Sequence, residues 1–224
     1  MPVIGDLVPS WAVARHRYDD VPGEPADVLF PEEAARMARA VPQRQREFAS
    51  VRVCARAALE RLGVAPVPLL PDRRGAPQWP AGVVGGMTHC DGYRAAVVAR
   101  TGDAASIGVD AEPDRPLPEG ILEAVALPAE RRMVAELASR RPGVHWGRLL
   151  FSAKESVFKT WYPLTRRSLE FEEAELTVSP DTGTFRARLL VPGPVVAGRR
   201  VEVLDGRWAA GSGLLVTAIA LPAR

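Results

Sequence analysis

The chain has 224 residues, enough to bury one large hydrophobic core or two smaller ones. Its composition, 47% hydrophobic and 25% charged, is ordinary for a globular protein, and a net charge of +2 argues against a nucleic-acid binder. No stretch approaches the roughly 20 apolar residues of a membrane span, and the opening MPVIGDLVPS has no secretory signal. We therefore expect a cytosolic protein that binds neither membrane nor nucleic acid, with Cys54 and Cys90 as reduced thiols.

The first half of the chain predicts helices followed by a small sheet. After an irregular, proline-rich start, a short helix is expected in PEEAARMARA and a longer one over 43–62, which Gly63 ends. The longer helix carries an apolar stripe formed by Phe48, Val51, Ala55, Ala58, Leu59 and Leu62. Arg44, Arg52 and Arg56 lie off this stripe, either as a solvated basic face or as a clamp for an anion. Three strands follow in VVGGMTHC, YRAAVVAR and SIGVDAE.

The second half has the same order of elements. A helix near 129–139 leads into the helix LLFSAKESVFKTWYP, which Pro163 is expected to end. The remainder is strand-like, in SLEFEEAELTV, TFRARLLV, VEVLDGRWAA and GLLVTAIAL. This order indicates an α+β fold of two comparable halves that meet near residue 113, although no residue-level repeat is visible.

Two acidic residues stand close together near the middle of the chain. Side chains alternate along the predicted strand SIGVDAEP, so one of its faces carries Gly108, Asp110 and Glu112. Two carboxylates this close repel each other unless something positive lies between them. Oxygen ligands without a neighbouring His or Cys suit a hard cation, Mg²⁺ before Zn²⁺. The alternative is an exposed strand end with two ordinary surface acids.

The lysine-bearing helix supplies a third carboxylate, because Ser152, Glu155 and Lys159 share one of its faces. A capping box from Ser152 to Glu155 and a helical ion pair from Glu155 to Lys159 are the structural alternatives. The cap is disfavoured because RLLF upstream already has a helical pattern. Lys154 and Lys159 are the only lysines among 29 basic residues. A routine ion pair would not need lysine, whereas a compact ammonium that can lose its proton suits a phosphate site beside a metal.

Together these motifs resemble a known family. GVDAEP, followed further along the chain by FSAKESVFKTW, is similar to the two-part signature of the 4′-phosphopantetheinyl transferases. GGMTHCDGYRAAVV, the EFASVRVCARAAL helix and the RRGAPQWP loop resemble other parts of the family, in the same order, over residues 44–173. Within the family the chain is most similar to the surfactin-type group and its PptT-like branch.

The resemblance implies a monomer of two similar α+β halves related by a pseudo-twofold axis, with coenzyme A in the cleft between them. Residues 1–112 would bind the nucleotide and supply the first metal carboxylates, and residues 113–224 would bind the pantetheine arm and face the carrier protein. The implied reaction moves phosphopantetheine from coenzyme A to a serine of an acyl or peptidyl carrier protein and releases adenosine 3′,5′-bisphosphate. The cofactor would be Mg²⁺, with Mn²⁺ as an alternative. The partners would be carrier proteins of fatty-acid, polyketide, siderophore or nonribosomal peptide assembly lines.

The resemblance also assigns roles at the reacting end of the site. Asp110, Glu112 and Glu155 would hold the metal on the pyrophosphate, with the carbonyl of Ala111 as a further ligand. Glu155 is equally the expected general base for the carrier serine, and the two roles of Glu155 stay alternatives. Lys159 would neutralise charge on the pyrophosphate and protonate the leaving phosphate.

Other positions are implied for the two ends of coenzyme A. The 3′-phosphate would meet Arg44, Arg52 and His89, with Thr88 beside them. The loop PDRRGAP has arginine where the family often has lysine, so either Arg73 or Arg74 would take that place. Lys154 would support the catalytic cluster, and the pantetheine arm would lie along Leu169.

Two other kinds of protein would share part of this pattern. A Mg²⁺-dependent hydrolase of nucleoside phosphates would share the acidic cluster and would release phosphate with no carrier protein present. A non-catalytic protein that binds coenzyme A or a carrier domain would keep the basic helix face. Such a binding protein would not need Glu155 and Lys159 together, so the presence of both favours an enzyme.

Overall fold

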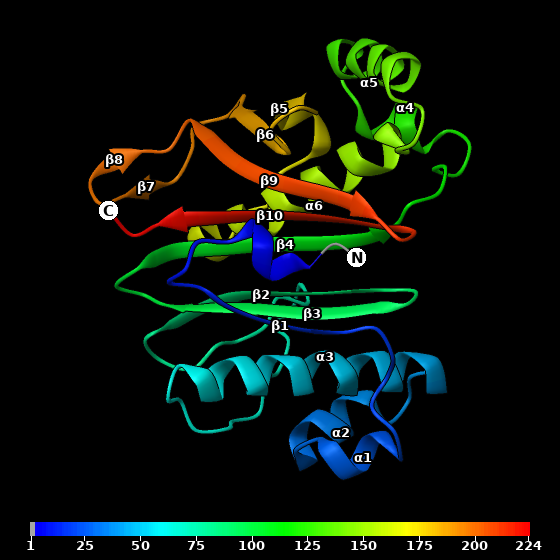
Figure 1. The fold of residues 1–224 in the computed structure, drawn as a ribbon. Helices are drawn as coiled ribbons and strands as arrows, with labels where there is room; N and C mark the ends of the chain where they lie inside the picture. The colour runs from blue at the N-terminus through cyan, green and yellow to red at the C-terminus, as the bar shows by residue number, and fades with distance from the viewer. Residues whose placement is uncertain (1–2) are drawn as a thin grey trace.

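The computed structural model describes residues 3–224, with helices at both ends of the molecule and strands between them (Figure 1). The N-terminal elements are η1 (Ile4–Leu7), β1 (Val13–Arg17), α1 (Pro25–Val28), α2 (Pro31–Met37), α3 (Pro42–Arg61), β2 (Val83–Cys90) and β3 (Tyr93–Arg100). The others are β4 (Ala104–Pro113), α4 (Ile121–Val125), α5 (Pro128–Arg140), α6 (Trp146–Thr165), η2 (Phe171–Glu173), β5 (Ala174–Ser179), β6 (Thr184–Leu189), β7 (Val195–Val196), β8 (Arg199–Arg200), β9 (Val203–Gly211) and β10 (Leu214–Pro222). None of the helices in this range could span a membrane.

Two antiparallel sheets adjoin in the middle of the molecule. One has the order β1-β3-β2 and the other β4-β10-β9-β6-β5. The sheets meet along β2 and β4, where a Cβ added to Gly86 would lie 3.0 Å from the carbonyl oxygen of Ile107. The hydroxyl of Thr88 on β2 accepts a hydrogen bond from the backbone N–H of Ala111 at 3.0 Å. Strand β4 therefore joins the two sheets.

Each half has a short proline-led helix, then a helix of 20 residues, then antiparallel strands. Figure 1 shows α1 to α3 on the side of the three-stranded sheet and α4 to α6 on the side of the five-stranded one. The expected α+β fold of two similar halves is confirmed. The division between residues 112 and 113 stays a prediction. Strand pairing places all of β4 with the later strands, because Asp110 pairs with Thr217 on β10.

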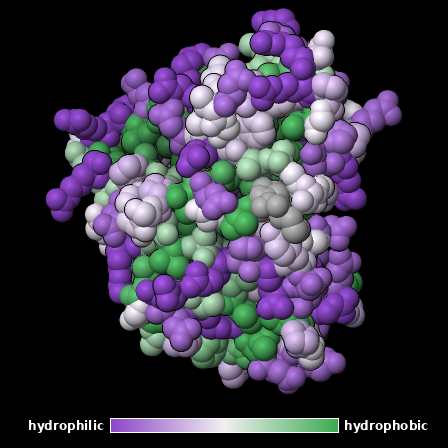
Figure 2. Space-filling model, in the orientation of Figure 1, coloured by the Kyte–Doolittle hydropathy of each residue, from purple (hydrophilic) through white to green (hydrophobic). Residues whose placement is uncertain are grey.

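Three clusters of buried apolar side chains hold the layers together. One lies between α3 and the three-stranded sheet, one between the two sheets, and one between α5, α6 and the five-stranded sheet. The predicted stripe of α3 is buried, except that Leu62 is only partly covered. Large apolar side chains left exposed are scattered over separate segments, at Val41, Leu190 and Val195. Figure 2 accordingly shows hydrophobic patches separated by hydrophilic side chains on the face in view.

Strand β4 and helix α6 touch along their length with a fixed step: two residues along β4 correspond to four residues back along α6. The matched pairs are Ser106 with Thr160, Gly108 with Ser156, Asp110 with Ser152, and Glu112 with Arg148. Two strand residues rise about 6.6 Å and four helix residues about 6 Å, so the match persists. The acidic side chains of β4 are thereby set against successive turns of α6.

Gly108 permits this contact. A Cβ at this position would overlap the carbonyl oxygen of Ser156 and lie 2.7 Å from the backbone nitrogen of Thr160. Glycine is required by the close approach of two backbones, because a side chain there would force the strand and helix apart. The face predicted for Gly108, Asp110 and Glu112 is therefore the face against α6.

Two expectations about local structure were wrong. The N-terminal segment is not irregular, because β1 pairs with β3 and forms an edge of the first sheet. Helix α6 does not end at Pro163 but continues to Thr165, followed by Arg166 in the left-handed conformation at φ 55°. Pro163 lies in the last turn, where its missing N–H costs one helical hydrogen bond, and the helix ends two residues later.

We predict that Gly108→Ala lowers the free energy of unfolding by about 3 kcal/mol, because the new methyl group overlaps the backbone of α6. Chemical denaturation measures the loss. Gly102→Ala is the matched control, since a Cβ at Gly102 has no neighbour within 4 Å. Equal stability of the two variants would contradict the close packing of β4 on α6.

Candidate active site

A cavity of about 400 Å³ lies between the two halves. Its walls include most of the residues that the sequence predicts for substrate or metal, namely Arg44, Arg52, Arg73, Thr88, His89, Asp110 and Lys159. They come from α3, the loop before β2, β2 itself, β4 and α6. Sequence reasoning missed Arg36 and Met37 of α2, which also line the cavity. They carry no motif, and only the packing of α2 on α3 brings them there.

Arg52 is directed into the protein, so the interpretation of a solvated basic face is wrong for this residue. It is 5% exposed, and its Nε donates to the carbonyl oxygen of Leu69 at 3.0 Å. Its guanidinium lies over the ring of Phe48, and a carboxylate oxygen of Glu33 is 3.7 Å from its Nε. Burial lowers the pKa of Arg52 to about 9, although Glu33 opposes the shift. Arg52 therefore keeps a fixed positive charge at neutral pH.

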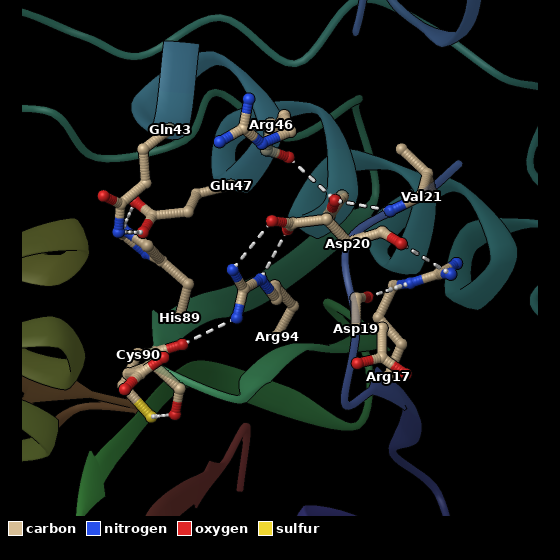
Figure 3. Close-up of polar contacts among 12 residues, drawn as sticks. Arg17, Asp19, Asp20, Val21, Gln43, Arg46, Glu47, His89, Cys90 and Arg94 are labelled. Atoms are coloured by element: carbon tan, nitrogen blue, oxygen red, sulfur yellow. Dashed lines mark hydrogen bonds and ion pairs between the residues drawn. The ribbon is translucent and has the colours of Figure 1, made fainter. Parts of the chain in front are cut away.

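His89 and Arg44 form a second polar group at the same cavity. The guanidinium of Arg44 donates to Nε2 of His89, and Glu47 lies 3.4 Å from that nitrogen. Burial, followed by the charge of Arg44, lowers the pKa of His89 to about 4, so its imidazole is neutral at pH 7. Figure 3 shows His89 directed toward α3 and Arg94 directed toward Asp20. The bidentate contact of Arg94 with Asp20, at 2.7 and 3.0 Å, anchors the start of β3, where Arg94 pairs with His89 of β2.

Asp110 is the point at which side chains from both halves converge. It is 4% exposed, and both of its carboxylate oxygens have partners. Oδ1 accepts from Nζ of Lys159 at 2.6 Å and from the hydroxyl of Thr88 at 3.3 Å, and Oδ2 accepts from the hydroxyl of Ser152 at 2.8 Å. Lys159 thus pairs with Asp110, and no ion pair between Glu155 and Lys159 occurs among residues 3–224. The alternative of a routine helical ion pair is wrong.

Glu112 and Glu155 lie in the electrostatic field of Asp110. Burial, and then the charge of Asp110, raises the pKa of Glu112, whose carboxylate accepts from Arg148 at 3.0 Å. Burial also raises the pKa of Glu155, with Lys159 opposing and Asp110 adding to the shift. The charge of Asp110 therefore acts on both of the other carboxylates. Within residues 3–224, however, no three His, Cys, Asp or Glu side chains are grouped so as to hold a metal.

The donor chemistry of this region still fits a hard cation. All three acidic side chains are oxygen donors, and those of Asp110 and Glu112 project from the same face of β4. Lys159 and Arg148 neutralise these two carboxylates in the present arrangement. The alternative of a capping box from Ser152, which the sequence disfavours, does not occur, because α6 begins at Trp146 and Ser152 lies in its second turn.

Two further cavities continue the first one. The second, of about 250 Å³, shares Lys159 and Met87 with the first and adds Glu155 and Arg74. A third, of about 180 Å³, shares Glu155 with the second and is lined mainly by apolar groups, including Phe158, Leu169 and Phe171. Neighbouring cavities share wall residues, so the three adjoin along one path from the arginines, past Asp110 and Lys159, to the apolar surface around Leu169.

Asp72 fixes the loop that lines both of the first two cavities, and the sequence did not single it out. Its carboxylate accepts from the backbone N–H of Arg74 at 2.8 Å and from the hydroxyl of Tyr162 on α6 at 2.9 Å. Arg74 donates to the hydroxyl of Ser168 at 3.0 Å, whereas Arg73 lines the first cavity. The two arginines therefore lie in different cavities, on a loop tied to the second half.

Comparison with known proteins shows the family to which the chain belongs. The model of the 4′-phosphopantetheinyl transferase N-terminal domain matches residues 32–99, and that of the 4′-phosphopantetheinyl transferase superfamily matches residues 106–209. The chain is 67% identical to the 4′-phosphopantetheinyl transferase Svp of Streptomyces mobaraensis, over 99% of this chain and 90% of that protein. This chain belongs to the 4′-phosphopantetheinyl transferase superfamily.

Other relatives agree with this assignment. The chain is 47% identical to the 4′-phosphopantetheinyl transferase PptT of Mycobacterium tuberculosis, over 98% of both proteins. It is 32% identical to enterobactin synthase component D of Escherichia coli O157:H7, over 67% of this chain and 73% of that protein. The resemblance inferred from the sequence motifs is confirmed, and with it the expected enzyme class.

Lys154, the other lysine of the transferase, does not belong to the cluster around Asp110, contrary to expectation. Nζ of Lys154 donates to the carbonyl oxygens of Phe171 and Ala174, at 2.6 and 3.0 Å, and lies 2.9 Å from the carboxylate of Glu130. Burial lowers the pKa of Lys154, while Glu130 opposes the shift. Lys154 therefore ties α6 to α5 and to the start of β5, which places it in the framework of the second half.

We predict that Lys159→Arg lowers kcat of the transferase by roughly tenfold to a thousandfold, because a planar, permanently protonated guanidinium cannot replace a compact ammonium against Asp110. Affinity for coenzyme A should change much less. Steady-state kinetics with one apo carrier protein measures both values. An unchanged kcat would contradict the role of Lys159.

Lys154→Arg is the matched control. It should lower the melting temperature, because the larger side chain does not fit between Glu130 and the two carbonyl groups, while kcat per folded molecule stays near the parent value.

Proposed function

We propose that this transferase moves the 4′-phosphopantetheine arm of coenzyme A to a serine of an acyl or peptidyl carrier protein and releases adenosine 3′,5′-bisphosphate. The observation that carries the proposal is the path of three adjoining cavities, which share wall residues. The path is cationic at one end, has a carboxylate and an ammonium in the middle, and is apolar at the other end. Coenzyme A has the same order of chemistry, with nucleotide phosphates, a pyrophosphate and a pantetheine arm.

The cationic end suits the nucleotide. Arg52, Arg44 and His89 line the first cavity and would meet the 3′-phosphate, because charge-assisted hydrogen bonds are the strong contacts to such an anion. Arg73 lines the same cavity and would reach the nucleotide phosphates. At the opposite end, Leu169 and its apolar neighbours would cover the pantetheine arm. The pyrophosphate would then lie beside Lys159.

Mg²⁺ is the metal that these side chains suit. Asp110, Glu112 and Glu155 would hold it, with the carbonyl of Ala111 as a further ligand, and Mn²⁺ is an alternative of similar chemistry. When bound, the metal would neutralise charge on the pyrophosphate and orient it for attack. The raised pKa values of Glu112 and Glu155 support the proposal, because they reflect burial beside another acid that a cation would relieve.

The chain's own residues would carry the proton transfers. The serine oxygen of the carrier would form a bond to the phosphorus next to the pantetheine arm, and the bond from that phosphorus to the nucleotide's phosphate oxygen would break. Glu155 lines the second cavity together with Lys159, and it would accept the serine proton. Lys159 would stabilise the charge that develops on the leaving phosphate, and could return a proton to it.

The choice of carrier protein is a narrower proposal. The likeness to enterobactin synthase component D favours siderophore assembly among the possible pathways, with polyketide, nonribosomal peptide and fatty-acid carriers as the others. We further propose that the transferase acts as a monomer in the cytosol, where coenzyme A and carrier proteins meet.

Intact-protein mass spectrometry of an apo carrier domain, incubated with the enzyme, coenzyme A and Mg²⁺, tests the proposed reaction. The carrier should gain one phosphopantetheine group at its serine, and adenosine 3′,5′-bisphosphate should appear in equal amount. Coenzyme A cleaved without a change in carrier mass would point to a hydrolase. Binding of coenzyme A with no product at all would point to a non-catalytic binding protein.

We predict that Asp110→Asn lowers kcat at least about a hundredfold, because it removes the charge that holds both the metal and Lys159. The amide keeps the shape of the side chain, so the fold should persist, as circular dichroism can verify. Asp205→Asn, on the exposed face of β9, is the control that should leave turnover unchanged.

Excess chelator should stop the wild-type reaction, and added Mg²⁺ should restore it. Turnover that persists in chelator is incompatible with the metal role proposed for Asp110.

A further inference from the structure

Two buried glutamates occupy equivalent places in the two halves, a residue-level repeat that the sequence alone did not reveal. Glu33 is the third residue of α2 and Glu130 the third residue of α5, and each helix begins with proline. Each carboxylate accepts one hydrogen bond from the backbone just before its own helix and one from a backbone N–H far along the chain. The donors are Phe30 and Leu69 for Glu33, and Leu127 and Leu176 for Glu130.

The two glutamates differ in the positive charge that they meet. Glu130 pairs with one cation, Lys154 on α6, at 2.9 Å. Glu33 meets two cations on α3: Arg56 donates to both carboxylate oxygens, at 3.2 and 3.0 Å, and Nε of Arg52 lies 3.7 Å away. The charges around Glu130 are therefore balanced, whereas those around Glu33 include one cation more than carboxylates. A surplus buried charge is costly unless it has an anion to meet.

The surplus charge is Arg52, because Arg56 is engaged by both carboxylate oxygens of Glu33 and lies outside the walls of the first cavity. Arg52 lines that cavity. It is held there by a closed chain of contacts: Glu33 accepts from the N–H of Leu69 at 2.8 Å, and the carbonyl oxygen of Leu69 accepts from Arg52 at 3.0 Å. Glu33 thus fixes both the side chain and the backbone segment that holds it.

We propose that Glu33 is a positioning residue for the nucleotide end of the coenzyme A site: it holds Arg52 where this side chain would meet the 3′-phosphate, and it holds the start of the loop that carries Arg73. The inference rests on the proposed function of this cavity. Glu33 itself does not touch the ligand, since it is fully buried and lies outside the cavity walls. Its loss should therefore act on the 3′-phosphate alone and leave the reacting end, around Asp110, unchanged.

Isothermal calorimetry with coenzyme A and with 3′-dephospho-coenzyme A, both with Mg²⁺, tests this inference without any carrier protein. The quantity to compare is the dissociation constant of 3′-dephospho-coenzyme A divided by that of coenzyme A. This ratio measures discrimination in favour of the 3′-phosphate. Glu33→Gln should lower this ratio by about tenfold, the size of one charge-assisted contact. Glu130→Gln is the matched control: it removes an equally buried capping carboxylate and should lower the melting temperature similarly, but it should leave the ratio unchanged.

The outcomes separate this inference from the function on which it rests. A wild-type enzyme that binds both ligands equally well would refute the nucleotide site itself. A wild-type enzyme that discriminates, with Glu33→Gln discriminating equally well, would refute the role of Glu33 alone. A loss of discrimination in both glutamine variants would mean that Glu33 acts only through general stability.

A second pair of variants covers the case in which Glu33→Gln fails to fold. Glu33→Asp keeps the charge beside Arg52 and Arg56 but is one methylene too short to reach the N–H of Leu69 as well. It should lower the discrimination ratio by a few fold, with Glu130→Asp as its control. Discrimination unchanged in Glu33→Asp would overturn the proposal.

Discussion

Backbone contact between β4 and α6 is the constraint on which the rest of the structure depends. Gly108 allows the strand to approach the helix closely enough for hydroxyls of α6 to reach across it, and Ser152 and Ser156 both contact Thr217 on the neighbouring strand β10. With that distance set, the step of two strand residues to four helix residues fixes which side chains face each other. Asp110 therefore meets Ser152 and Lys159 without any loop having to be ordered, which is how a rigid framework positions a reacting group.

Charge balance explains why the centre of the cleft is stable with its acidic residues so close together. Asp110 and Glu112 each have a cation at hydrogen-bond distance, and Asp110 also accepts from two hydroxyls. These cations make the site tolerable in the absence of substrate, because burying unpaired like charges would be costly. A substrate pyrophosphate with its metal would replace one set of neutralising charges by another. Lys159 could then turn from Asp110 to the phosphate with little change in net charge.

Much of this site could be predicted from the sequence, and the exceptions have a common cause. Alternation along SIGVDAEP correctly placed Gly108, Asp110 and Glu112 on one face, because strand periodicity is local. The burial of Arg52 and the turn of Lys154 away from the cluster could not be predicted, because both depend on contacts with glutamates far away in sequence. Strand β1 was missed for a similar reason: VARHR lacks apolar alternation and becomes a strand only through pairing with β3. Asp72 carries no motif at all, and its importance comes from Tyr162, on the other half.

The two buried glutamates show how one framework, used twice, can support two different ends of a ligand site. In each half a proline-led helix presents its third residue to the long helix that follows it. That residue is in both cases a glutamate whose carboxylate caps its own helix. The two halves differ in the cations that pair with this glutamate. At Glu130 a single lysine neutralises the carboxylate. This pair lies beside the apolar end of the path, where an additional positive charge would have no partner. Two arginines at Glu33 leave one positive charge over, at the end where an anion can complete the balance. Because the two frameworks share a geometry and differ in charge, this difference of one buried cation adds to the polarity that the other arginines of the first cavity give the cleft.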